Sequence, residues 1–282
     1  MQDLNRPVRE FVAIPWQGDT VRIEYQWIGA SASDRQPAEP ARPIVVFLHE
    51  GLGSISLWKD FPHRFCEAVG LRGLVFSRAG YGQSSPRPAG QRWPISFMHG
   101  QAHDMLPALL AALGVEKPWL FGHSDGASIA LLYAAQYPQA VAGLIVVAPH
   151  IFVEDITIDN IELARQAYLT TDLRAKLGRH HADPDSAFWG WNDVWLDPEF
   201  RRWNIEAVLH EIVCPILAVQ GEQDEYGTLQ QIYGIKTLVP QTALYIIPGC
   251  GHSPHRDQPE ALAKEVARFL LAHPPDHSRS NP

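Results

Sequence analysis

The amino-acid sequence predicts an α/β protein with a mostly parallel sheet. Six short apolar runs recur along the chain, and each is continuous rather than alternating, which is typical of strands buried on both faces. Helix-like stretches separate most of these runs, as in repeated strand–helix–strand units. The six expected strands are Ile44 to Leu48, Gly73 to Phe76, Trp119 to Phe121, Leu144 to Val147, Ile216 to Val219 and Ala243 to Ile247.

Other segments complete this pattern. Phe11 to Ile14 and Val21 to Trp27 partly alternate, which predicts an antiparallel edge hairpin that turns near Gln17-Gly18-Asp19. The stretch from Ala30 to Pro43 is polar and rich in proline, so it is expected to be a surface loop. Helical patterns are expected at Phe97 to Leu113, Ala127 to Tyr137 and Glu260 to Leu271.

The stretch from His150 to Val213 breaks this rhythm, because it contains no convincing core strand and helical patterns dominate it. It predicts a helical cap, residues 150–213, inserted between core segments 1–149 and 214–273, with a disordered tail at 274–282. Six aromatic residues crowd its second half, either as the core of a helical subdomain or as a face toward a ligand. They are Phe188, Trp189, Trp191, Trp195, Phe200 and Trp203.

Composition excludes several classes of protein. The 282 residues carry a formal net charge of −8, which argues against binding to a nucleic-acid backbone or through a polybasic membrane anchor. Three widely spaced cysteines favour neither a disulfide scaffold nor a zinc site, and we expect no metal. The first residues lack a signal-peptide pattern and no stretch is apolar enough to span a membrane, so a cytoplasmic location is the expectation.

The sharpest motif is Gly122-His123-Ser124-Asp125-Gly126, which is G-x-S-x-G between an expected strand and an expected helix. A nucleophile on so tight a turn needs small residues two positions before and two after it, so that strand and helix can approach. The helix N-terminus also favours developing negative charge. We therefore interpret Ser124 as a nucleophile.

A serine nucleophile needs a base, and the base needs an acid that orients it. Asp224 and His252 each lie just past the end of an expected strand, where an open parallel sheet places its site. We predict His252 as the base and Asp224 as the acid. Glu222 and Glu225 are competing candidates for the acid.

Two backbone N–H groups are expected to form an oxyanion hole. One belongs to Asp125, which follows the nucleophile. The other comes from the loop His49-Glu50-Gly51-Leu52-Gly53, with Gly51 and Leu52 as the two candidates. Trp189, Trp191 and Trp195 are candidates for the substrate pocket, because an aromatic roof over the serine would exclude water and bind an apolar chain.

The chain resembles the α/β-hydrolase superfamily over nearly its whole length. That resemblance implies an eight-stranded, mostly parallel sheet with a helical cap after the sixth strand. Two departures stand out: His49-Glu50 replaces a frequent His-Gly, and Ser77-Arg78-Ala79 replaces Asp-Arg-Gly. The matching residues are His49 to Gly53, Arg78 to Ser84, Gly122 to Gly126, Gly221 to Asp224 and Gly251-His252.

These residues together predict a serine hydrolase that cleaves small to medium uncharged carboxylic esters through an acyl-enzyme, without a cofactor. The same constellation leaves open a carbon–carbon bond hydrolase, a lactonase, a cofactor-free haloperoxidase, an acyltransferase or a slow-turnover ligand-binding receptor. A small-molecule ester is the expected partner, nucleic acid and membrane are not expected, and a homo-oligomer is possible.

Overall fold

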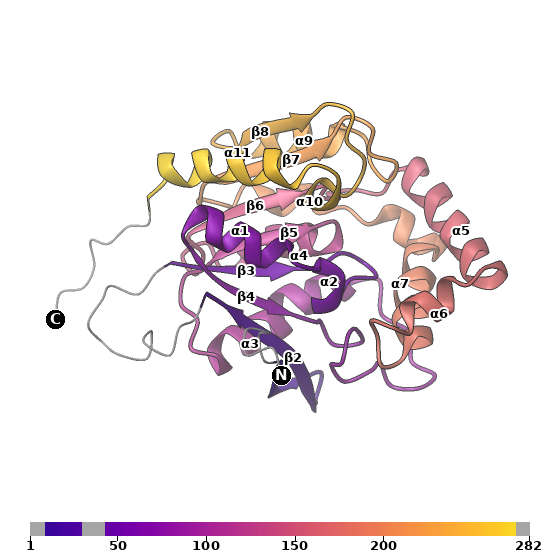
Figure 1. Ribbon diagram of the computed structural model, residues 1–282. Coiled ribbons are helices and arrows are strands. Elements are labelled where there is room, and N and C mark those ends of the chain that lie inside the picture. The colour runs from indigo at the N-terminus through magenta and orange to yellow at the C-terminus, as the bar shows by residue number, and fades with distance from the viewer. Residues whose placement is uncertain (1–8, 30–42, 275–282) are drawn as a thin grey trace, which may run out of the picture.

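A computed structural model describes residues 9–29 and 43–274 of the protein, which form one twisted sheet covered by helices (Figure 1). The strand order is β1-β2-β4-β3-β5-β6-β7-β8. The first two strands pair antiparallel and β2 pairs antiparallel with β4, whereas all other neighbours are parallel. The strands are β1 Glu10–Trp16, β2 Asp19–Ile28, β3 Ile44–Leu48, β4 Arg72–Phe76, β5 Trp119–His123, β6 Gly143–Val147, β7 Ile216–Gly221 and β8 Ala243–Ile247.

All six predicted core strands are present, with bounds that differ by at most two residues. Every residue of β5, β6 and β7 is buried, which is why these strands are continuous apolar runs in the sequence. The predicted edge hairpin is β1 and β2. Its turn residues Gln17 and Gly18 have φ of 52° and 84°, the conformation of a tight turn that matches strand twist. Of the predicted loop from Ala30 to Pro43, residues 30–42 lie outside the described residues, as does the predicted tail beyond residue 274.

Helices cover both faces of the sheet. The helices α1 and α11 pack together on one face, where Phe61, Phe65 and Leu262 join one apolar cluster. The helices α3, α4 and α9 cover the other face and contribute to a second, larger cluster. The helices of the core are α1 Phe61–Val69, α2 Phe97–Gly100, α3 Leu106–Ala112, α4 Asp125–Gln136, α9 Gln230–Leu238, α10 Pro254–Asp257 and α11 Pro259–Ala272.

The helix predicted from Phe97 to Leu113 is not regular. A π-helical turn, η3 (Gln101–Met105), separates α2 from α3. Pro107 lies in the first turn of α3, and because proline has no N–H it cannot continue the regular bonding of the preceding turn. The chain nevertheless keeps one helical path, so the apolar residues still face the sheet.

An inserted helical cap follows β6, as predicted, and lies at one end of the sheet in Figure 1. In it Asp183 accepts a hydrogen bond from the Ser186 N–H at 2.9 Å and so fixes the start of α7. The elements of the cap are α5 Asp155–Thr170, α6 Leu173–Leu177, α7 Pro184–Trp195, η4 Pro198–Arg202 and α8 Glu206–Leu209.

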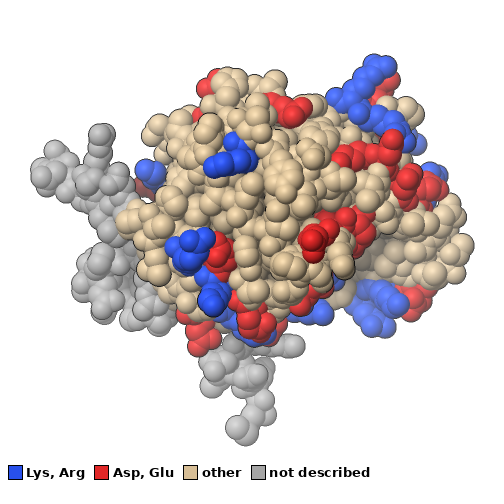
Figure 2. Space-filling view, turned by 90° about the horizontal axis from the view of Figure 1, so that it is seen from above, with Lys and Arg blue, Asp and Glu red and all other residues tan. Residues whose placement is uncertain are grey.

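Charged side chains of both signs lie beside one another on the face shown in Figure 2, with uncharged surface between them. Among residues 9–29 and 43–274, no helix has the length and apolar character needed to cross a bilayer.

Candidate active site

The loops that follow β3, β5, β7 and β8 meet at the cap end of the sheet, and Ser124 occupies the turn between β5 and α4. Its φ and ψ are 53° and −121°, a region that a non-glycine residue rarely adopts. The Ser124 N–H donates to the carbonyl oxygen of Val147 on the neighbouring strand at 2.9 Å. Strained backbone of this kind persists where the surrounding structure imposes it, and it clusters at functional sites.

Glycine is required on both sides of this turn. A Cβ on Gly122 would lie 2.4 Å from the carbonyl oxygen of Gly126, and a Cβ on Gly126 would lie 2.1 Å from that of Leu48. Both neighbours are backbone atoms, so no side-chain rotation could relieve the overlap. The turn therefore brings strand and helix as close together as the G-x-S-x-G spacing predicts.

The structure brings the side chains of Asp224 and His252 together. Asp224 lies after β7 and accepts a hydrogen bond from His252 Nδ1 at 2.8 Å. The same carboxylate accepts from the Tyr226 N–H at 2.9 Å and from Gln220 Nε2 at 3.1 Å. These donors fix the carboxylate, and the carboxylate fixes the imidazole with its proton on Nδ1 and Nε2 free to accept.

Electrostatics at this pair favour a charged imidazole. Burial alone would lower the pKa of His252, but the carboxylates of Asp224, Glu225 and Glu50 outweigh burial and raise it above its ordinary value. Burial alone would raise the pKa of Asp224, but the hydrogen bonds and the nearby His252 keep it below its ordinary value. The site is thus built to stabilise an imidazolium that forms beside an ionised carboxylate.

The competing acids occupy other places. Glu222 is exposed. Glu225 accepts the backbone N–H of His252 at 3.0 Å, so it holds the histidine loop rather than the imidazole. No local pattern predicts this contact, because it joins residues of two loops that are 27 positions apart in the chain.

The two backbone regions expected to bind an oxyanion are Asp125, directly after Ser124, and the loop after β3, whose His49 carbonyl oxygen lies against Gly126 in the first turn of α4. Asp125 begins α4, whose first N–H groups have no partner within the helix. In the loop after β3, a Cβ on Gly51 would lie 2.2 Å from the indole nitrogen of Trp191, so this indole packs on the Gly51 backbone. The carbonyl oxygen of Leu52 accepts from His181 Nε2 at 3.0 Å.

Two of the three predicted tryptophans contact this region. Trp191 lies against Gly51, and Trp195 donates from its indole nitrogen to Asp125 at 3.2 Å. They share α7 at a spacing of four, as predicted. Trp189, on the same helix, packs against Tyr168 and Phe188 inside the cap.

The buried side chains of His150 and Asp125 make contacts at this site that the sequence analysis did not predict. His150 follows β6, and its ring lies 6.0 Å from that of His252 and 5.1 Å from that of Trp195; burial lowers its pKa to about 3. Asp125 is fully buried 3.7 Å from the Arg78 guanidinium, and burial raises its pKa to about 6. No short-range pattern predicts these side-chain contacts, because the partners come from distant elements.

His181 is a further residue that the sequence analysis missed. It accepts the Gly82 N–H on Nδ1 at 2.9 Å and donates from Nε2 to Leu52, so it links the cap to two core loops. Burial lowers the pKa of His181 to about 4. The imidazole therefore stays neutral, with one ring nitrogen that accepts and one that donates.

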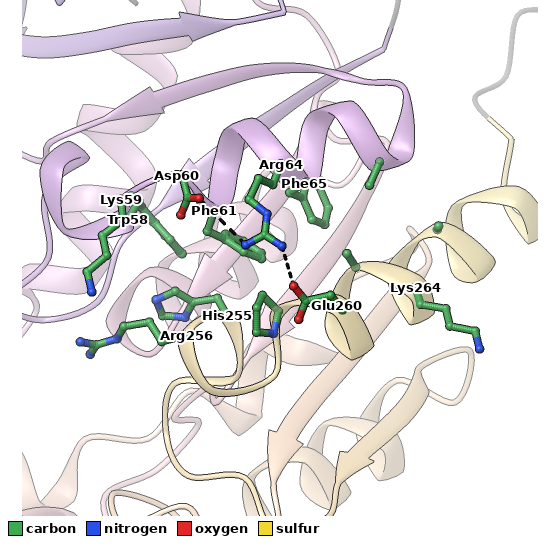
Figure 3. Close-up of a pocket in the computed structure, with 14 residues that line it drawn as sticks. Trp58, Lys59, Asp60, Phe61, Arg64, Phe65, His255, Arg256, Glu260 and Lys264 are labelled. Carbon is green, nitrogen blue, oxygen red and sulfur yellow. Dashed lines mark hydrogen bonds and ion pairs between the residues drawn. The ribbon is translucent and has the colours of Figure 1, made fainter. Parts of the chain in front are cut away.

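The three cysteines are buried and unpaired. Burial raises the pKa of the Cys250 thiol to about 11, as expected for a packing residue near His252 rather than a nucleophile. A separate hollow of about 430 Å³ lies between α1 and α11, with Trp58, Phe61 and His255 among its lining (Figure 3).

Comparison with known proteins shows the family. The profile described as "Alpha/beta hydrolase family" matches residues 45–265, so the chain belongs to the alpha/beta hydrolase family. Serine hydrolase BPHL of Homo sapiens is 28% identical over 209 residues, which cover 70% of this chain and 68% of that protein. A 2-hydroxy-6-oxononadienedioate/2-hydroxy-6-oxononatrienedioate hydrolase of Comamonas testosteroni is 24% identical over 187 residues. That match covers 57% of this chain and 65%, just under two thirds, of the relative.

Solved structures agree in fold. A thermophilic esterase from Thermogutta terrifontis superposes with a TM-score of 0.70 at 19% identity, covering 94% of this chain and 99% of that one. At that identity the likeness establishes the fold of the hydrolase and not its substrate.

Proposed function

We propose that the protein is a serine hydrolase that cleaves carboxylic esters through an acyl-enzyme. The observation that carries this proposal is the hydrogen bond of 2.8 Å between His252 Nδ1 and Asp224, on a loop that His123, the residue before the serine on its strained turn, holds through the His252 carbonyl oxygen. A buried acid–histidine pair next to a serine at a helix N-terminus is what activation of a hydroxyl nucleophile needs.

In the proposed reaction the oxygen of Ser124 attacks the ester carbonyl carbon while His252 Nε2 takes the hydroxyl proton. Asp224 stabilises the imidazolium that forms, and that imidazolium then gives its proton to the leaving alcohol. Water repeats the sequence on the acyl-enzyme and releases the carboxylic acid.

Negative charge develops on the carbonyl oxygen during both attacks. The N–H groups of Asp125 and of Gly51 or Leu52 are the proposed donors to that oxygen. Trp191 of the cap packs on Gly51 of the loop. This packing supports a pocket in which the substrate chain runs from the reacting carbonyl group between the loop and the cap. We propose an uncharged chain of short to medium length, because the roof here is aromatic.

A second candidate is hydrolysis of a carbon–carbon bond with the same residues. The similarity to the dienedioate hydrolase of Comamonas testosteroni favours it. Comparing turnover of p-nitrophenyl esters with that of an oxo-dienoate separates the two, since each substrate reports one bond cleavage.

The nucleophile is tested with a fluorophosphonate probe and with Ser124→Ala. The native enzyme should be labelled rapidly, and peptide mapping should place the adduct on Ser124. The variant should fold normally, lose labelling, and lose about three or more orders of magnitude in kcat for p-nitrophenyl esters. Retention of more than about a tenth of the activity would refute the assignment.

A further inference from the structure

The carboxylate of Glu50, in the loop after β3, folds back over its own loop. A Cβ on Gly53 would lie 2.5 Å from Glu50 Oε2, so Gly53 makes room for this side chain. The carboxylate thereby faces the end of the neighbouring strand β5, and its Oε2 lies 3.6 Å from His123 Nδ1.

The hydrogen bonds of His123 constrain its protons. His123 is 1% exposed and directly precedes Ser124. Its Nε2 lies 2.8 Å from the carbonyl oxygen of His252, and a carbonyl oxygen only accepts, so Nε2 must carry a hydrogen. Its Nδ1 faces the Glu50 carboxylate. A lone pair there would be repelled by an ionised carboxylate, whereas an N–H would be attracted to it.

The surroundings favour the ionised form of Glu50. Burial opposes its charge, but His123, whose Nδ1 faces the carboxylate, is the main influence that outweighs burial and holds the pKa of Glu50 below its ordinary range. The titratable groups that face His123 are Glu50 after β3, His150 after β6, His252 after β8 and His255 on α10, whose ring lies 4.6 Å from that of His123. Burial lowers the pKa of His255 and of His150, so both are neutral neighbours and Glu50 is the one acid among these groups.

The backbone of Glu50 is fixed as firmly as its side chain. Its carbonyl oxygen accepts from His49 Nδ1 at 2.7 Å, from Arg78 Nη2 at 2.8 Å and from the Gly53 N–H at 3.0 Å. A carboxylate on so rigid a loop holds its partner in one orientation.

We propose that Glu50 and His123 form an ion pair, buried at His123 and half-buried at Glu50, that braces the loop of His252 against the turn of Ser124, and that they act as positioning residues for the hydrolysis proposed above. The pair joins three loops: Glu50 precedes the oxyanion candidate Gly51, His123 precedes the nucleophile, and His252 O receives the hydrogen bond. Glu50 orients the His123 ring, and the ring holds the backbone that carries the base.

The first measurement follows protonation of His123 by NMR of histidine-labelled enzyme, with His123→Asn used to assign its signal. At neutral pH both ring nitrogens of His123 should carry hydrogens in the native enzyme, and Glu50→Gln should lose the hydrogen on Nδ1, because the opposite charge that holds it there is gone. Glu222→Gln, which removes an exposed carboxylate, should keep both hydrogens. A neutral His123 in the native enzyme, or both hydrogens retained in Glu50→Gln, would overturn the ion pair.

The second measurement is a double-mutant cycle on ester hydrolysis. Glu50→Gln and His123→Asn should each lower kcat by about tenfold with KM nearly unchanged, and the double variant should be no worse than either single one. If the losses in kcat of the two single variants instead multiply in the double variant, the two residues do not act as a unit. If Glu50→Gln keeps native kcat while Ser124→Ala is inactive, the brace fails and the proposed function stands. If Ser124→Ala stays active, the proposed function fails, and the NMR measurement of the His123 ring hydrogens still tests the pair.

Discussion

At the scale of single residues, the hydrogen bond between Asp224 and His252 decides what the site can do. Gln220 and the Tyr226 N–H occupy further lone pairs of the same carboxylate, so Asp224 is held in one orientation. Replacing it by asparagine keeps the shape but can present an N–H to the imidazole, which stabilises the wrong tautomer. We expect Asp224→Asn to lose up to about 10⁴-fold in kcat.

Glu225→Gln and Glu222→Gln are matched controls for that prediction, and both should cost far less. Glu225→Gln retains an oxygen that can accept the His252 N–H, and Glu222 is exposed. If Glu225→Gln were instead the crippling change, the acid would be assigned to the wrong residue.

The pH dependence of the rate is also set at this scale. His252 acts as a base only when it is neutral, so kcat/KM should rise as the pH passes upward through the pKa of His252. Its carboxylate neighbours raise that pKa, so the midpoint should lie above the ordinary 6.5 of histidine. In Asp224→Asn the residual kcat/KM should also rise with pH, but with its midpoint at a lower pH, because the charge that favours the imidazolium is gone. A rate independent of pH between about 5 and 9 would contradict the role of His252.

At the scale of elements, the turn between β5 and α4 is the most tightly constrained part of the site. Gly126→Ala would place a Cβ against the backbone of Leu48 at the end of β3. Since neither backbone can rotate away, we expect a loss of about 2 kcal/mol or more in the free energy of unfolding, measured by chemical denaturation.

Gly178→Ala, at the end of α6 in the cap, is the control for the Gly126→Ala substitution. Gly178 has φ of −61°, and the nearest atoms to an added Cβ are 3.5 Å away, which is ordinary contact. The free energy of unfolding of Gly178→Ala should be unchanged or rise by up to about 1 kcal/mol, because alanine loses less backbone entropy on folding than glycine does. Equal losses in both variants would show that contact at the turn is not the cause.

At the scale of the whole molecule, the cap and the core together form the proposed substrate pocket. Trp191→Ala and Trp195→Ala should each change kcat/KM by about 10- to 100-fold and alter the ranking of acetate, butyrate and octanoate esters. Trp189→Ala should leave that ranking intact, since Trp189 packs within the cap. Unchanged selectivity in the first two variants, with the fold retained, would make these tryptophans packing residues.

The sequence by itself determined the sheet, the order of its elements and the place of the inserted cap. It also determined Ser124, Asp224 and His252 as candidates, because these follow from local signals: continuous apolar runs, a G-x-S-x-G turn, and polar residues directly after strand ends. Such signals lie within about ten residues of chain, and a reader of the sequence can recognise each one.

The tertiary structure alone decided the contacts between those elements. The orientation of Glu50 toward His123, the hold of Glu225 on the His252 backbone, and the bridge from His181 to Leu52 each join loops far apart in the chain. Trp189 and Trp191 are two residues apart, yet one packs inside the cap and the other on Gly51. Sequence patterns record which residues are buried, whereas the partner of a buried polar group depends on how strand ends and cap helices pack together in space.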